Sequence, residues 1–78
     1  MGIFAIISAI LSLLKFLKDL PEWVQMVKDL VALIRGLKGD ERKAAAFELL
    51  DATEHMVKHK DGARLKRLRE RLHGGSVA

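Results

Sequence analysis

The chain has no cysteine, no tyrosine, a single proline and only four aromatic residues among 78. Without cysteine, neither a disulfide framework nor a thiolate metal site can form. No stretch alternates apolar and polar residues with the period of two that is typical of a half-buried strand. Half of the residues are hydrophobic, and many of them are leucine, isoleucine or alanine. The sequence therefore predicts an all-α protein with one small domain, residues 1–78.

Motifs for catalysis are also missing. None of the three serines lies in a Gly-x-Ser-x-Gly turn, and no phosphate-binding loop is present. Asp51, His55 and His59 are spaced four residues apart, which would place three metal-binding side chains on one helical face. The His-Glu-x-x-His motif of zinc proteases is absent, because Met-Val-Lys separates the two histidines. We interpret these residues as a hydrated surface and predict no enzyme, cofactor, metal site or small-molecule substrate.

The most unusual stretch is Ile3–Leu14, which has no charged residue. Read as a helix, it has one narrow polar stripe, formed by Ser8, Ser12, Lys15 and Asp19. A helix that is apolar nearly all round is buried in protein or in lipid. Its uncharged part is about 18 Å long, against about 30 Å of hydrocarbon in a bilayer. The segment could cross a thinned bilayer, lie in one leaflet or form the centre of a protein bundle.

The next segment, Asp19-Leu20-Pro21-Glu22, predicts the end of one helix and the start of another. Asp19 can act as the helix cap and Glu22 can complete a capping box, while proline is tolerated in a first turn. One long helix kinked at Pro21 is the alternative, because a seven-residue repeat of polar positions continues through the proline. We favour two helices that meet at an angle, over residues 3–18 and 20–35.

Two further breaks divide the rest of the chain. Glycines at 36 and 39, followed by a potential cap at Asp40, predict a third helix over residues 41–60. Asp61-Gly62 precedes a short fourth helix, residues 63–73, and residues 74–78 form a tail. The expected organisation is thus a hydrophobic helix pair (1–39) and a charged helix pair (40–73).

The small size of the chain suggests that its first two helices need an outside partner. A chain of this length buries only about 60–65% of its unfolded surface. We therefore expect lipid or further copies of the chain to cover the apolar amino-terminal half. The predicted contact residues are Ile3, Phe4, Ile7, Ile10, Leu11, Leu14, Leu17, Trp23, Val27, Leu30 and Ile34.

The predicted fourth helix is strongly basic, and residues 61–78 carry a net charge of +3. Its candidate contacts to an anionic partner are Arg64, Lys66, Arg67, Arg69 and Arg71. Three interpretations remain open: binding to anionic lipid headgroups, binding to nucleic-acid phosphates, or packing of its leucines on the third helix. In the last case the arginines would be solvated or paired with Glu48, Asp51 and Glu54. The lack of interleaved aromatic residues disfavours nucleic acid.

The start of the chain resembles the phenol-soluble modulins, which are short membrane-active peptides, at Met1, Gly2, Ile3, Ala5 and Ile7. A hydrophobic amino terminus with a basic carboxyl terminus also resembles phage holins. We therefore expect a membrane-associated, self-assembling protein that permeabilises a membrane or lines a membrane or particle, with its charged half in the cytoplasm. The alternatives are a soluble helical oligomer with a structural or adaptor role, in the cytoplasm or in a viral or other large particle, and a nucleic-acid-binding protein.

Overall fold

The computed structural model describes residues 2–74, with side chains as far as Leu72. This part of the chain is all-α, as the sequence predicts, and contains no strand. Its elements are α1 (Ile3–Leu13), the short 3₁₀-helix η1 (Leu14–Leu17), α2 (Pro21–Arg35), α3 (Gly39–His59) and α4 (Ala63–Gly74). Residues 75–78 of the expected tail lie outside the described part.

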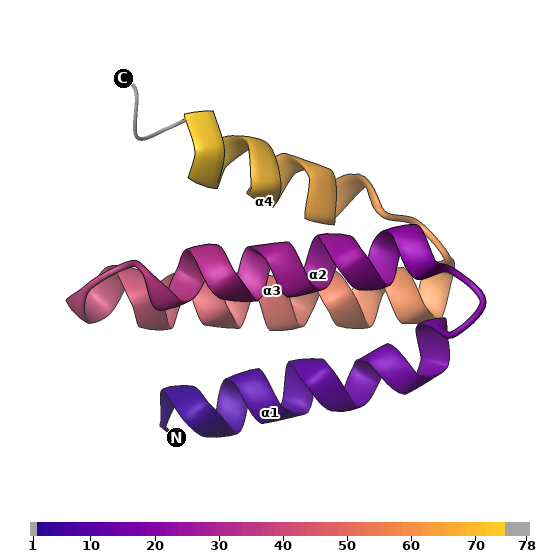
Figure 1. The fold of residues 1–78 in the computed structure, drawn as a ribbon, viewed down its shortest axis with the longest axis horizontal. Coiled ribbons are helices and arrows are strands. Elements are labelled where there is room, and N and C mark those ends of the chain that lie inside the picture. Colours follow the sequence, from indigo (N-terminus) through magenta and orange to yellow (C-terminus); the bar gives the residue numbers. More distant parts are fainter. Residues whose placement is uncertain (1, 75–78) are drawn as a thin grey trace.

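The long helix α3 is the centre of the fold. It packs against α1, α2 and α4, whereas α1 packs mainly on α3 and little on its neighbour in sequence, α2. Successive helices alternate in direction, and α1 and α4 lie on opposite sides of the α2–α3 pair (Figure 1). The molecule is flattened, with extents of 33 × 28 × 17 Å. Because α1 and α4 do not close on each other, the molecule has two open edges, each formed by one helix.

One hydrophobic core joins all the helices. Three of the buried side chains of α3 are alanines, Ala45, Ala46 and Ala52, and such small side chains allow neighbouring helices to approach closely. Thr53 is also buried, and its hydroxyl donates a hydrogen bond to the Leu49 carbonyl oxygen at 2.7 Å. The remaining buried apolar side chains are Ile6, Ile7, Ile10, Leu17, Val27, Leu30, Val31, Ile34, Leu49, Met56, Leu65 and Leu68.

The expectation that the chain cannot cover its own first helix is wrong for one face of that helix. Ile6, Ile7 and Ile10 of α1 are buried against the rest of the molecule, and so is Leu17 of η1. The size argument failed because α1 lies at an edge, where only the face that packs on α3 has to be covered. The opposite face, including the predicted stripe of Ser8 and Ser12, is exposed.

Pro21 marks a full turn between two helices, as favoured from the sequence. The predicted capping box is wrong, because Leu20 is the N-cap of α2 and no side chain caps the helix. The turn is held by backbone hydrogen bonds, from the Leu20 N–H to the Leu17 oxygen at 2.8 Å and from the Trp23 N–H to the Leu20 oxygen at 3.0 Å. Leu20 also packs against the core. Burial of an apolar side chain therefore fixes this turn in place of a polar cap.

The other two breaks differ from the prediction in their details. Lys38, rather than Asp40, is the N-cap of α3, and no side-chain cap is made. Gly39 has the left-handed backbone (φ 61°) that only glycine adopts without cost. At the carboxyl end of α3 the left-handed residue is Lys60 (φ 56°), not a glycine. Gly62 instead makes room for Trp23, because a Cβ at this position would lie 3.3 Å from the indole Cε2.

Candidate interaction surfaces

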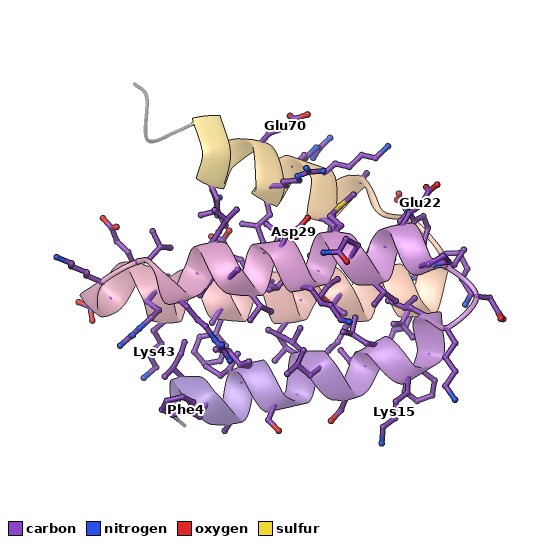
Figure 2. The ribbon with its side chains drawn as sticks, in the orientation of Figure 1. Phe4, Lys15, Glu22, Asp29, Lys43 and Glu70 are labelled. Atoms are coloured by element: carbon purple, nitrogen blue, oxygen red, sulfur yellow. The ribbon has the colours of Figure 1, made fainter. Side chains whose placement is uncertain are left out.

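The α1 side of the molecule retains large apolar side chains in contact with solvent. Phe4 is 80% exposed, Leu11 41% and Phe16 65%, and Phe47 of α3 is 44% exposed. Lys43 lies on the α1 side of α3 (Figure 2), and Phe47 follows it by four residues, on the same helical face. We call Phe4, Leu11, Phe16 and Phe47 the apolar edge. Large exposed apolar side chains on one side of a molecule make that side a candidate contact surface for a protein or a membrane.

The polar groups on the outer face of α1 are small or cationic. The Ser12 hydroxyl donates a hydrogen bond to the Ser8 carbonyl oxygen at 3.0 Å, so its donor is already satisfied within the helix. Lys15 projects from the outer side of α1, and Phe4 lies near the other end of the same helix (Figure 2). Lys18 is exposed at the end of η1. Residues 3–18 contain no carboxylate, and the first one in the chain is Asp19.

The opposite edge is formed by α4, whose apolar side chains face inward. Leu65 and Leu68 are buried, and Leu72 packs against the core. Arg64 pairs with Asp51 of α3, with 3.0 Å between Nη1 and Oδ2, and Arg71 pairs with Glu48 of α3. These contacts agree with the third interpretation of the basic helix, in which its leucines pack on α3 and its arginines pair with carboxylates of α3. The third predicted partner, Glu54, makes no ion pair within the described residues.

Further carboxylates surround the remaining cations of α4. Lys66, Arg67 and Arg69 are exposed and form no ion pair in the part of the chain that the structure describes. Glu70 lies among them, and Glu22 and Asp29 lie on the side of α2 that faces α4 (Figure 2). Glu48 and Asp51 pair with Arg71 and Arg64, whereas no ion pair joins Glu22, Asp29 or Glu70 to a cation of α4 in the described residues.

The histidine pair lies at the junction of α3 and α4. The ring centroids of His55 and His59 are 4.6 Å apart, and His55 Nε2 lies 3.8 Å from Asp61 Oδ2. Asp61 Oδ1 accepts a hydrogen bond from the Ala63 N–H at 3.0 Å, capping the start of α4. This bond is the main reason that the pKa of the Asp61 carboxyl is lowered. No group of three metal-binding side chains occurs among the described residues, and Asp51 pairs with Arg64 instead.

The structure divides the residues expected to contact lipid or another copy into three groups. Six of them are buried within the molecule: Ile7, Ile10, Leu17, Val27, Leu30 and Ile34. Three pack partly buried against the core: Ile3, Leu14 and Trp23. Phe4 and Leu11 alone among the eleven are exposed. In this conformation the exposed contact surface is therefore smaller than the sequence suggested, and it lies on the outer face of α1.

Sequence reasoning missed Phe16 and Phe47. Phe16 follows Ser12 by four residues, and Phe47 follows Lys43 by four. Both phenylalanines therefore share a helical face with a polar residue, and this spacing was a signal that they would be exposed.

No helix in the described residues is long and apolar enough to span a membrane. No family model matches the chain, and no curated protein or solved structure is significantly similar to it.

Proposed function

We propose that this protein is a non-enzymatic peripheral membrane protein that binds the lipid surface through its apolar edge. The observation that carries the proposal is the exposure of Phe4, Leu11 and Phe16 along an edge helix. An interfacial helix lies in the plane of the membrane, with its apolar side chains about 5–10 Å below the headgroups. α1 can take this position while its inner face stays packed on α3.

The energetics suit reversible binding. Full burial of a phenylalanine or leucine side chain stabilises by about 1.5–3 kcal/mol relative to exposure. Three or four partly exposed side chains therefore supply several kcal/mol, enough for partition onto a bilayer but not for permanent insertion. The Ser12 hydroxyl adds little desolvation cost, because it is already bonded to the Ser8 carbonyl oxygen.

Lipid fits this edge better than a second copy of the chain does. A symmetric dimer through the α1 face would be isologous, so that the same surface patch of each copy is used. Both patches would then carry Lys15 and Lys18, and residues 3–18 contain no carboxylate that could pair with these cations across the interface. At a membrane, the long lysine side chains can extend to the headgroups while their neighbours enter the apolar layer. Self-assembly, which the sequence analysis expected, would then take place between membrane-bound copies through other surfaces.

Vesicle flotation of the full-length protein tests the proposal. We expect the wild-type protein to float with vesicles and the Phe4→Ser/Phe16→Ser variant to lose most of this binding. Both side chains are exposed, so the thermal unfolding of the variant should match that of the wild type. A matched control is Lys66→Ser/Arg69→Ser on the opposite edge, which should still float.

Two results would overturn the proposal. One is that wild-type protein fails to float with vesicles of any composition. The other is a stable dimer in plain buffer that Phe4→Ser/Phe16→Ser dissociates, because the apolar edge would then belong to a second copy.

A further inference from the structure

The charges around the apolar edge point to the class of lipid. Resting on the proposed function, we infer that the bound membrane is anionic and that Lys15, Lys18 and Lys43 contact its phosphate headgroups. The chemistry is that of an ammonium group with a lipid phosphate. The contact surface is the apolar edge together with these three lysines.

The three lysines are placed at both ends of this surface. Lys15 of η1 extends from the outer side of the molecule just after α1, and Lys43 lies at the end of the molecule where Phe4 is found (Figure 2). All three side chains are exposed, and none forms an ion pair within the described residues. Asp19 is the carboxylate next to Lys18 in sequence, and it offsets part of this charge. A flat surface that reaches Phe4 and Phe16 would therefore meet positive charge at each end of α1.

The opposite edge, formed by α4, differs from the α1 side in its ion pairs and in its apolar side chains. Arg64 and Arg71 of α4 are already paired with carboxylates of α3, and Glu70 lies on α4 itself. Leu65 and Leu68 are buried, so α4 offers no large exposed apolar side chain in its described part. A membrane that attracts the net positive charge of the chain is thus expected to meet α1, with α4 directed away from the bilayer. This orientation reverses the sequence-based hypothesis that the basic fourth helix contacts the anionic partner.

The experiment compares two triple variants that remove the same charge from opposite edges. One is Lys15→Gln/Lys18→Gln/Lys43→Gln and the other is Lys66→Gln/Arg67→Gln/Arg69→Gln. Binding of each full-length protein is measured with vesicles of phosphatidylcholine alone and with vesicles that also contain phosphatidylglycerol. A basic residue near an anionic surface contributes about fivefold to partition. We therefore expect the α1-side variant to lose up to about a hundredfold on anionic vesicles and the α4 variant to lose at most a few-fold.

The outcomes separate the two proposals. Equal binding of the wild type to neutral and anionic vesicles would overturn the inference and leave the proposed function standing. Failure to bind either kind of vesicle would overturn the proposed function itself. A larger loss in the α4 variant than in the α1-side variant would also overturn the inference, because the anionic surface would then lie against α4. Circular dichroism of both variants confirms that the exposed substitutions leave the helices intact.

Discussion

The helices α1 and α4 occupy equivalent places on opposite sides of the α2–α3 pair, yet the fold treats them differently (Figure 1). α4 buries its leucines and pairs two of its arginines with carboxylates of α3. α1 and the following η1 bury one apolar face and leave Phe4, Leu11 and Phe16 in solvent. The fold therefore buries the leucines of α4 and pairs two of its arginines within the molecule, whereas it covers only one apolar face of α1.

This difference between α1 and α4 bears on which edge would contact a partner. The charges of α4 suggest an anionic partner when the sequence is read alone, but carboxylates distant in sequence lie close to them in the folded chain. The apolar residues of α1 have no such counterpart on their outer face. An exposed apolar side chain is favoured at a contact with lipid or protein, whereas an exposed ion pair is already stable in water.

The largest expected effect is on the free energy of unfolding, and it distinguishes the buried face of α1 from the exposed one. Ile10 is fully buried and Leu11, the next residue, is partly exposed. Ile10→Asp places an unpaired carboxylate in the core, and we expect it to cost at least about 4 kcal/mol of the free energy of unfolding, enough to unfold so small a domain. The matched Leu11→Asp variant should cost less than about 1 kcal/mol. Chemical denaturation followed by circular dichroism measures both. Similar losses for the two variants would show that α1 does not pack on α3 through this face.

The next effect concerns the docking of α4. Gly62→Val places a branched side chain against the Trp23 indole, where even a Cβ would be 3.3 Å from Cε2. We expect a loss of about 1–3 kcal/mol in unfolding free energy, because overpacking displaces the ring or the start of α4. Trp23 is the single tryptophan, so its fluorescence reports the change directly. Gly36→Ala is the control and should be nearly neutral, since Gly36 has an ordinary helical φ of −80°. An unchanged emission spectrum in Gly62→Val would contradict this contact.

A smaller effect measures how much the ion pairs of α4 contribute. Arg64 and Asp51 are both well exposed, so their coupling should be only about 0.2–1 kcal/mol. A double-mutant cycle with Arg64→Gln and Asp51→Asn gives this value, and it should fall as salt is added. A coupling that salt does not change would indicate that the pair is shielded from solvent.

The smallest effect concerns the pH dependence of the start of α4. The pKa of Asp61 is lowered chiefly by the Ala63 N–H, with a further contribution from His55. A lowered pKa in the folded state means that the carboxylate stabilises the fold above its unfolded pKa of about 3.9, and that this stabilisation is lost as the pH falls through the folded pKa. Wild-type and Asp61→Asn proteins should therefore differ in stability near neutral pH and converge in acid. NMR titration should place the Asp61 pKa below its ordinary value, and an ordinary or raised value would contradict the capping bond.

Much of the secondary structure could be predicted because it depends on near neighbours in sequence. The helices change where the sequence predicts: α2 begins at Pro21, α2 ends at Arg35 and α3 begins at Gly39, and Asp61-Gly62 lies between α3 and α4. The capping residues were less predictable. Leu20 rather than Asp19 occupies the N-cap position of α2, where it packs against the core and no side chain caps the helix.

The candidate site was harder to predict. The sequence identified the apolar character of α1 and two exposed residues of its edge, Phe4 and Leu11. It also assigned Ile7 and Ile10 to an outside partner, although the structure buries both. Whether an apolar residue is covered depends on which helix packs against it, and here α3 covers the inner face of α1.

The sequence by itself determined the helical class, the places where the chain turns and the inward stripe of leucines on α4, because the helical period and local backbone preferences act over a few residues. The tertiary structure alone decided which face of α1 is covered and which cations are neutralised. Both depend on residues that are far apart in sequence, such as Arg64 with Asp51 and the inner face of α1 with α3, and no local pattern specifies which distant helix will lie alongside.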